Sequence, residues 1–433
     1  MTVAGIILML AAGLRAENVA LGPRYIDPQH GFSLRPPAGA DRNRAYSAHR
    51  LVQWSLRDRK TGAIAWTLTV RSEAGPDPGV TLKDFIEAMK GRLGRKEGIR
   101  VESILPARVL GKDALYVRAQ TGGKTRRWLY ELWVLAEPGR FLALSMGGAL
   151  SMRQKLEAVG REVASTLRLT DPKSLAEARK ENLRRGRELL RRVTDEKLAS
   201  ILSAKPRWYL YFRGNRPIGF LHASERIIQR RFAKGLEVRT FARLEITGGQ
   251  VMQIRRVMFA SADRTSESWT ETVRIVRDGK VVRTMSESGS VGAGTIVCKV
   301  ASGGKTATRK KALAGTTAEH YLPRAMALVL PRLADRTRLA AYAFATYTTA
   351  ANDFDMRTFT MLAPEKITLG ARTIEAVRAS DQVAADAEAA TLHLQADGGL
   401  LRMRTGVGIV MEQATRSAVL RRHRDAEKLL HGR

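Results

Sequence analysis

The residues of this chain that could carry out chemistry are few and scattered. Its single cysteine, Cys298, excludes an internal disulfide, a cysteine-rich zinc site and a CxxC redox pair. The cysteine follows Thr295-Ile296-Val297, a run typical of a strand, so we expect a small buried side chain. The seven histidines form no HExxH, and the chain has no Gly-x-Ser-x-Gly elbow. The sequence therefore predicts no catalytic residue.

Two pairs of polar residues have spacings that a metal site could use. His222 and Glu225 lie three residues apart, and Asp353 and Asp355 could together chelate a hard cation. Both pairs also fit exposed polar positions beside strands, and neither has a third ligand nearby in the sequence. We therefore predict no metal and no cofactor.

Two Gly-Gly-Lys-Thr stretches, 122–125 and 303–306, invite comparison with a phosphate-binding loop. That motif needs another glycine five residues before the glycine that precedes the lysine, where this chain has Arg118 and Lys299. Each stretch also joins two predicted strands, whereas a phosphate loop opens a helix. Both are therefore predicted to be hairpin turns.

The charge of the chain is strongly positive but not concentrated. The 433 residues include 74 Lys and Arg against 42 Asp and Glu, a formal net charge of +32. A nucleic-acid-binding arm would gather this charge into a block or stripe, and none is present. An even excess fits a compositional bias, or a surface that meets phospholipid head groups, anionic wall polymers or nucleic acid.

The first sixteen residues resemble a secretory signal peptide. Residues 3–14 form an apolar run followed by Arg15 and Ala16, although no basic residue precedes the run. We expect residues 1–16 to be removed and the protein to be extracytoplasmic, either periplasmic or secreted. No other stretch reaches 18 apolar residues, so we expect no transmembrane anchor.

Residues 20–170 are predicted to form an α/β domain. A helix is expected at 82–93, strands at 114–119, 127–135 and 141–146, and a closing helix that starts after Ser151. The middle strand carries apolar residues on both faces, which is typical of a strand covered on both sides. The opening Gly31-Phe32-Ser33-Leu34-Arg35-Pro36-Pro37 and this strand order resemble the PsbP-like α/β/α fold. That resemblance implies a binding or assembly module without catalytic residues.

Residues 171–204 are predicted to form a basic connecting helix. Asp171-Pro172 is a helix start, and the only residue that disfavours a helix after it is Gly186. Arginines and glutamates four residues apart, such as Glu181 with Arg185 and Glu188 with Arg192, favour a solvated face over a polyanion site.

Residues 206–413 are predicted to form a strongly curved antiparallel sheet or an open half-barrel, interrupted by one helix near 323–334, with a basic helix or tail at 414–433. Alternating residues over 236–246 indicate a half-buried strand, and Asp278-Gly279 is a hairpin signal. The fold class expected for the whole chain is therefore α+β.

Three stretches of this second domain resemble the LolA/LolB-like half-barrels: Tyr209–Gly219, Thr368–Val377 and Asp397–Met403. The resemblance implies reversible binding of an acyl chain or another apolar ligand without catalysis. We expect arginines at the rim of an apolar concave face to hold an anionic head group. The candidates are Arg239, Arg243, Arg255 and Arg274. The alternatives are an envelope scaffold that binds polyanions through its surface and, less favoured, a cytoplasmic nucleic-acid binder.

Overall fold

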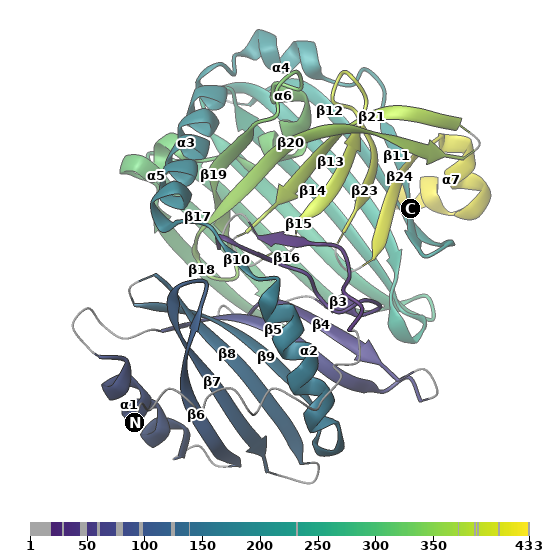
Figure 1. Cartoon of the computed structure of the whole chain (residues 1–433). Coiled ribbons are helices and arrows are strands. Elements are labelled where there is room, and N and C mark those ends of the chain that lie inside the picture. The colour runs from purple at the N-terminus through teal and green to yellow at the C-terminus, as the bar shows by residue number, and fades with distance from the viewer. Residues whose placement is uncertain are drawn as a thin grey trace, which may run out of the picture. The chain divides into compact units, whose positions relative to one another are not determined.

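The structure is a computed structural model in which the chain forms two compact units, Met1–Ala176 and Glu177–Arg433. It describes residues 19–27, 30–43, 50–58, 61–74, 81–94, 98–122, 126–137, 139–230, 233–370, 372–384, 387, 389–405 and 408–431. The predicted signal peptide and most of the turn at 122–125 lie outside the described residues. Each unit is considered by itself below (Figure 1).

The main sheet of the first unit has seven strands in the order β3-β4-β5-β9-β8-β7-β6, and all neighbours are antiparallel. A small sheet, β1-β2-β10, brings the start and end of the unit together. The strands are β1 (Tyr25–Asp27), β2 (Phe32–Leu34), β3 (Asp41–Asn43), β4 (Arg50–Arg57), β5 (Ile64–Ala74), β6 (Ile99–Val109), β7 (Lys112–Thr121), β8 (Arg127–Glu137), β9 (Arg140–Ala149) and β10 (Arg168–Leu169).

Both faces of this sheet are covered, as the double apolar pattern of β8 predicts. Trp128 and Tyr130 face a core closed by α2 (Arg153–Ser165), whereas Trp133 faces a smaller core closed by α1 (Leu82–Gly94). The predicted start of α2 is wrong, because a 3₁₀ turn at Leu150–Met152 precedes it and Ser151 does not cap it. Strand β6 went unpredicted because its charged, proline-containing sequence shows no clear alternation.

Two helices, not one, occupy residues 171–204. Asp171 caps α3 (Pro172–Arg191) by accepting the Ser174 amide at 3.0 Å. The first helix ends at Arg191. Thr194 then caps α4 (Asp195–Ile201) by accepting the Lys197 amide at 3.1 Å. The Glu181–Arg185 pair forms at 2.8 Å, but Glu188 contacts Arg184 rather than the predicted Arg192.

The second unit is built on one antiparallel sheet of 14 strands, in the order β18-β17-β16-β15-β14-β13-β12-β11-β24-β23-β22-β21-β20-β19. Its edge strands, β18 and β19, do not pair with each other in the described residues, so the sheet is not a closed barrel. The strands are β11 (Arg207–Arg213), β12 (Arg216–Arg230), β13 (Ala233–Glu245), β14 (Val251–Ser261), β15 (Glu267–Arg277), β16 (Lys280–Gly292), β17 (Thr295–Ser302), β18 (Lys305–Ala312), β19 (Ala341–Thr348), β20 (Asp353–Leu369), β21 (Arg372–Gln382), β22 (Ala390–Leu394), β23 (Leu400–Arg404) and β24 (Ile409–Ala414).

Tight turns connect these strands where the sequence predicts them. Asp278 and Gly279 have φ of 49° and 74°, the left-handed pair that a two-residue hairpin between β15 and β16 requires. The stretch at 303–306 is the turn between β17 and β18, so its phosphate-loop interpretation is excluded.

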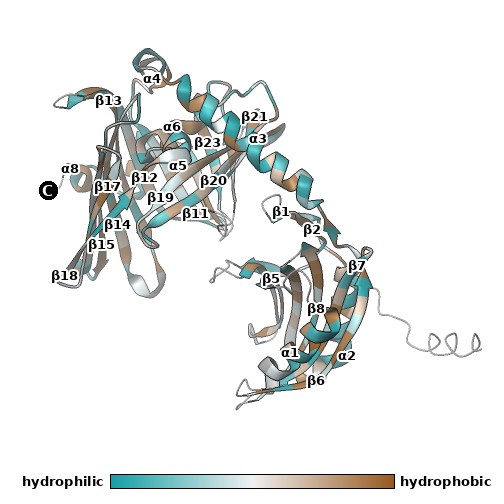
Figure 2. Cartoon of the chain, turned by 90° about the vertical axis from the view of Figure 1, so that its left-hand side faces the viewer, coloured by the Kyte–Doolittle hydropathy of each residue, from teal (hydrophilic) through white to brown (hydrophobic). Residues whose placement is uncertain are grey.

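The sheet curls around α6 (Arg324–Leu333), as Figures 1 and 2 show. The short helix α5 (Gly315–His320) precedes it, and Glu319 of α5 pairs with Arg187 of α3. We call the face that α6 covers the inner face. Ala325, Met326, Val329 and Leu330 of α6 are fully buried against β13, β14 and the strands from β19 to β22. The concave side that was expected to hold a ligand is therefore largely filled by the chain itself.

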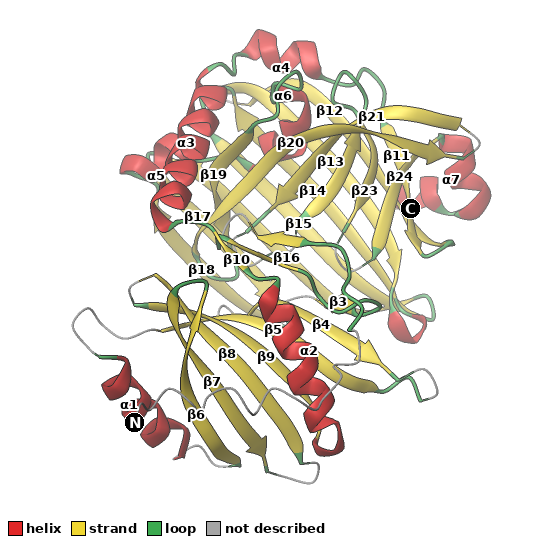
Figure 3. Cartoon of the chain, in the orientation of Figure 1, coloured by secondary structure: helices red, strands yellow, loops and turns green. Residues whose placement is uncertain are grey.

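Two short C-terminal helices, α7 (Arg416–Arg422) and α8 (Ala426–His431), pack on the opposite, outer face (Figure 3). Val419 and Ala426 are fully buried there against a cluster that includes Trp208, Phe220 and Phe241. The described residues of this segment, 414–431, are thus part of the fold of the second unit.

Candidate functional site

The four arginines predicted to bind a ligand all lie on the outer face, not at the rim of the inner one. Arg239 and Arg243 alternate along β13 with Val238 and Ala242, whose side chains are buried. Arg255 pairs with Phe241, which contacts the C-terminal helices. Gln253 on β14 pairs with Arg243 and also with Arg274 on β15, so Arg274 lies on the same face as Arg243. The alternation of polar and apolar residues that identified these arginines therefore also places them on the face of the sheet opposite the buried apolar side chains.

An open cleft of about 950 Å³ lies beside the C-terminal helices on this outer face and includes two of the four, Arg239 and Arg255. Its aromatic residues come from three adjacent strands: Trp208 on β11, His222 on β12 and Phe241 on β13. The Trp208 and His222 rings meet edge to face, with centroids 4.6 Å apart. Leu430 of α8 adds an aliphatic wall. This cleft is the candidate functional site.

Two of the cleft arginines hold the C-terminal helices in place. Arg255 donates to the carbonyl oxygens of Leu429 and Leu430 at 2.9 and 3.1 Å, and its guanidinium lies 5.4 Å from the centre of the Phe241 ring. Arg416 pairs with Glu427 across the two helices. Arg255 therefore adds a positive charge to the cleft, whereas the Arg416–Glu427 pair is neutral.

Another cleft arginine, Arg239, pairs with a buried carboxylate that three arginines share. Glu237 is 1% exposed and pairs with Arg226, Arg230 and Arg239, each at 2.7 Å. Burial by itself would raise the pKa of Glu237, but the hydrogen bonds from the three arginines outweigh burial and hold that pKa below its ordinary value. The carboxylate is thus ionised at neutral pH and cancels one of three positive charges. Arg239, half-exposed, offers positive charge to an anion in the cleft.

The other two predicted arginines lie outside this cleft. Arg243 lines a separate hollow of about 540 Å³ with His423, whose Nδ1 lies 3.5 Å from the guanidinium. Burial, and then the Arg243 charge, lower the pKa of His423, so this imidazole is neutral at pH 7. Arg274 is exposed further along the sheet, between Gln253 and Thr284.

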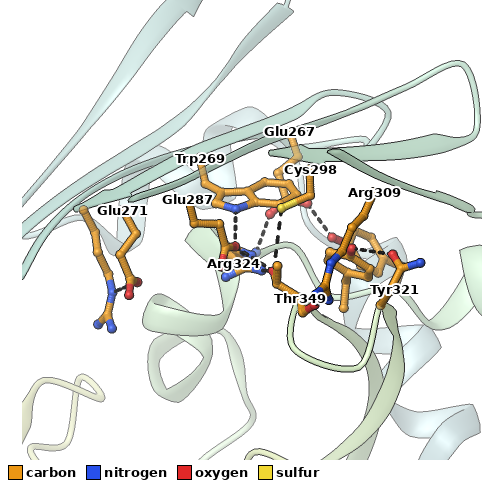
Figure 4. A network of polar contacts seen from close by, with 12 residues as sticks. Glu267, Trp269, Glu271, Glu287, Cys298, Arg309, Tyr321, Arg324 and Thr349 are labelled. Carbon is orange, nitrogen blue, oxygen red and sulfur yellow. Dashed lines mark hydrogen bonds and ion pairs between the residues drawn. The ribbon is translucent and has the colours of Figure 1, made fainter. Parts of the chain in front are cut away.

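The most extensive polar network of the inner face supports α6 (Figure 4). Glu267 accepts the Tyr321 hydroxyl at 2.6 Å and the Arg324 amide at 2.8 Å, so its carboxylate caps the start of α6. Arg324 lies over the Trp269 ring at 4.5 Å and pairs with Glu287 at 2.9 Å. All of these contacts join α6 and the segment before it to β15 and β16.

A second buried carboxylate fixes the other end of α6. Glu225 is 2% exposed and receives Arg332 of α6 at 2.6 Å, together with Arg207. Arg332 also donates to the Ile201 carbonyl oxygen at the end of α4. With Glu267 at one end and Glu225 at the other, the helix is held inside the curved sheet by ion pairs as well as by its apolar side chains.

The weaker sequence candidates are resolved by their surroundings. Phe241 on β13 pairs with His222, and Val238 pairs with Glu225, so these two side chains project from opposite faces of β12. Asp353 binds Lys311 at 2.8 Å, and Asp355 accepts the Thr348 hydroxyl at 2.7 Å. No cluster of three or more His, Cys, Asp or Glu in the described chain could hold a metal ion. Cys298 is fully buried, as predicted.

Sequence reasoning missed the apolar part of the cleft. Phe241 stands among charged residues in the polar half of the alternation on β13, where a large aromatic ring indicates a covered patch. On β11 the run Trp208–Phe212 is aromatic or apolar on both faces, which likewise indicates a strand covered on both sides. What covers the outer side, the helices at 416–431, could not be identified from the strands alone.

Comparison with known proteins finds similarity only in parts of the fold. No family model and no curated protein matches the sequence. Solved structures share parts of the fold at low similarity. Cyanobacterial PsbP (CyanoP) from Synechocystis is 17% identical with a TM-score of 0.28, and the match covers 37% of this chain and 98% of that one. A β-barrel-like protein with a domain of unknown function, DUF1849, from Brucella abortus is 11% identical with a TM-score of 0.33, and the match covers 48% and 93%.

A third such structure, a protein of unknown function from Pseudomonas aeruginosa, is 9% identical with a TM-score of 0.25, covering 34% of this chain and 95% of that one. Among the described residues, no helix is both long and apolar enough to cross a membrane. The described residues form mostly strands, arranged in antiparallel sheets that do not close into a barrel.

Proposed function

We propose that the second unit is a non-enzymatic binding domain for an anionic amphipathic molecule, held in the cleft between the outer face of β11–β14 and the C-terminal helices. The observation that carries this proposal is the combination of Trp208, Phe241 and Leu430 with Arg239 and Arg255 around one opening of about 950 Å³. An apolar tail would lie against Leu430 and the uncovered edges of the Trp208 and Phe241 rings, and would gain about 25 cal/mol for each Å² removed from water. The guanidinium of Arg239 would bind the anionic head through charge-assisted hydrogen bonds.

The absence of catalysis is part of this proposal and rests on how the buried acids are used. Glu225 and Glu267, both almost fully buried, are engaged by arginine, tyrosine and backbone groups that fix α6. His423 is engaged at Arg243. Glu225 and Glu267 line none of the openings described above, and His423, which lines the hollow of about 540 Å³, faces the Arg243 guanidinium there.

The remaining parts of the proposal concern the setting. The apolar run at 3–14 supports export, which makes an envelope lipid or fatty acid the natural class of ligand. The LolA/LolB-like resemblance supports the same class, although the proposed site lies on the outer face of the sheet. The PsbP-like pattern of the first unit supports a role for it in binding or assembly.

A matched pair of arginine variants tests the site. Arg239→Gln and Arg226→Gln each remove one guanidinium from Glu237, at nearly equal exposure of 53% and 56%, but only Arg239 lines the cleft. With a fluorescent sixteen-carbon fatty acid as probe, we expect Arg239→Gln to weaken binding roughly tenfold, the value of one charged hydrogen bond. Arg226→Gln should stay within about twofold of the unmodified protein.

A blocking variant and an extraction complete the test. Ser224→Trp places an indole in the cleft, so it should abolish probe binding while the fold is retained by circular dichroism. Organic extraction of the purified protein followed by mass spectrometry should release a bound lipid. Equal effects of the two arginine variants, or a protein that holds no lipid and takes up no probe, would refute the proposal.

A further inference from the structure

The outer face of strands β14 to β18 is a second surface with its own chemistry. The register from strand to strand aligns a column of side chains on β15 with one on β16, and both columns consist mainly of hydroxyl groups. Ser290 lies opposite Ser268, Ser288 opposite Thr270, and Ser286 opposite Thr272. The hydroxyl-bearing residues of this face include Ser268, Thr270, Thr272, Thr284, Ser286, Ser288, Ser290, Thr295, Thr306 and Thr308.

The opposite side of the same strands explains why these hydroxyls point outward. Gly289, between Ser288 and Ser290, faces inward, and a Cβ atom there would lie 2.2 Å from the Trp269 ring. The indole therefore occupies the space over the glycine, where it donates to Glu287 at 2.7 Å. Because Trp269 is 2% exposed, the inner side of β16 is fixed by the core and the serines on either side of the glycine are presented to solvent.

The charge of this outer face has a single sign. Arg274, Lys299 and Lys310 are exposed on it, and none of them forms an ion pair with a described residue. At every outward-facing position of β14 to β18 the residue is uncharged or basic, so no carboxylate neutralises these three cations. A surface of this composition is complementary to a polyanion.

A shallow hollow of about 370 Å³ lies within the hydroxyl columns. Ser268, Ser288 and Ser290 line it, with Arg230 at one end and Lys299 at the other. Arg230 donates to the Ser268 hydroxyl at 2.8 Å. The hollow is thus a place where an anionic group and neighbouring hydroxyls of one ligand could be bound together.

We propose that this face binds a linear anionic polysaccharide, a polymer that carries sulfate, phosphate or carboxylate groups along a chain of sugar hydroxyls. Serine and threonine both donate and accept hydrogen bonds, so columns of them match sugar hydroxyls, while the cations match the acidic groups. Successive outward side chains on a strand lie about 6.6 Å apart, so the columns repeat on the scale of a sugar residue.

Two other polyanions fit the face less well. Single-stranded nucleic acid is bound by aromatic rings that stack on its bases, and the aromatic ring among the described outward residues here, Phe259, is 1% exposed beneath Arg230. A lipid bilayer needs apolar side chains that insert, whereas the most exposed valines of these strands, Val281 and Val282, lie beside the turn that opens β16, and Val297 stands among hydroxyls and lysines. This inference does not depend on the amphipathic-ligand cleft, which uses different side chains.

The experiment compares two triple variants of the full chain with equal loss of charge. Arg274→Gln, Lys299→Gln and Lys310→Gln remove the cations of this face. Arg283→Gln, Lys305→Gln and Lys366→Gln remove three exposed cations elsewhere in the second unit. With a heparin oligosaccharide as the probe and calorimetry at low salt, we expect the first variant to bind at least tenfold more weakly and the second within threefold. Equal losses would overturn the proposal, because net charge alone would then explain binding.

A charge-neutral variant tests the hydroxyl columns. Ser286→Ala, Ser288→Ala and Ser290→Ala are exposed changes that leave every cation in place, and we expect heparin binding to weaken about fivefold with no change in binding of a DNA duplex. Neutral dextran should not bind. If the serine variant binds heparin as well as the unmodified protein, or if the DNA duplex or anionic phospholipid vesicles bind more tightly than heparin, the face is not a polysaccharide site.

Discussion

Gly186→Ala offers the sharpest test of how the second unit is packed, because helix propensity and sterics predict opposite signs. An alanine in place of glycine inside a helix normally stabilises a protein by about 1 kcal/mol. Gly186 lies in the middle of α3, so an isolated helix would gain that amount. In the structure, however, a Cβ atom at this position would lie 2.1 Å from the carbonyl oxygen of Ala343 on β19.

The expected magnitude follows from that distance. Real Cβ contacts are essentially never closer than 3.0 Å, so α3 and β19 would have to separate by about 0.9 Å. Because the clashing atom belongs to the backbone of a paired strand, no side-chain rotation can relieve the contact. Overpacking by one methyl group costs about 1–3 kcal/mol, and a rigid site falls at the upper end. After the gain in helix propensity, we expect a net loss of about 2 kcal/mol.

Urea unfolding of the full chain, followed by circular dichroism and pulse proteolysis, measures this change. Gly91→Ala is the control, since Gly91 is an exposed residue of α1 and should follow helix propensity with a gain of about 1 kcal/mol. If Gly186→Ala were as stable as the unmodified protein or more stable, α3 would not pack directly on the backbone of β19.

Two further predictions concern the buried carboxylates that hold α6. Arg332→Ala leaves Glu225 buried with Arg207 as its remaining cation, so it should lower the free energy of unfolding in urea by about 3–5 kcal/mol. The double variant Arg332→Leu plus Glu225→Leu should recover part of that stability. A loss below about 1 kcal/mol for Arg332→Ala would contradict the argument. Burial raises the pKa of Glu267 above its ordinary 4.5, despite hydrogen bonds from Tyr321 and Arg324 that lower it. The folded state therefore binds the proton more tightly than the unfolded chain, and stability falls as pH rises from 4.5 through the raised pKa. Glu267→Gln removes this pH dependence of stability. As the pH rises from 4.5 through the raised pKa, the free energy of unfolding of the unmodified protein should therefore fall relative to that of the variant. A rise relative to the variant would refute the argument.

Much of the local structure could be predicted because it depends on neighbours in the sequence. Asp171 and Pro172 start α3 through a cap that local residues supply, and Asp278-Gly279 forms its hairpin because few other dipeptides accept two positive φ angles. Alternation along β13 correctly separated two faces. It did not show which face would be covered, and by what.

The candidate site depends on segments that are distant in the chain. Phe241 could be recognised as unusual among charged neighbours, but its cover comes from helices almost 180 residues later. The prediction of an open concave face failed because α6, whose residues are apolar apart from Arg324 and Arg332, buries most of its surface inside the curved sheet. The local sequence indicates that a helix must be buried, but it does not indicate which surface of the sheet the helix packs against.

Taken by itself, the sequence determined most of the secondary elements, although not β6 or the break between α3 and α4, together with the main hairpin turns, the antiparallel character of the sheets and the lack of familiar catalytic motifs. It also determined that the arginines of β13 would share a face with other polar residues. Only the tertiary structure decided that this face would combine with the C-terminal helices into a cleft, and that hydroxyls and cations would align across β15 to β18. The reason is physical: periodicity within an element sets its two faces, whereas long-range burial and strand register decide what each face meets.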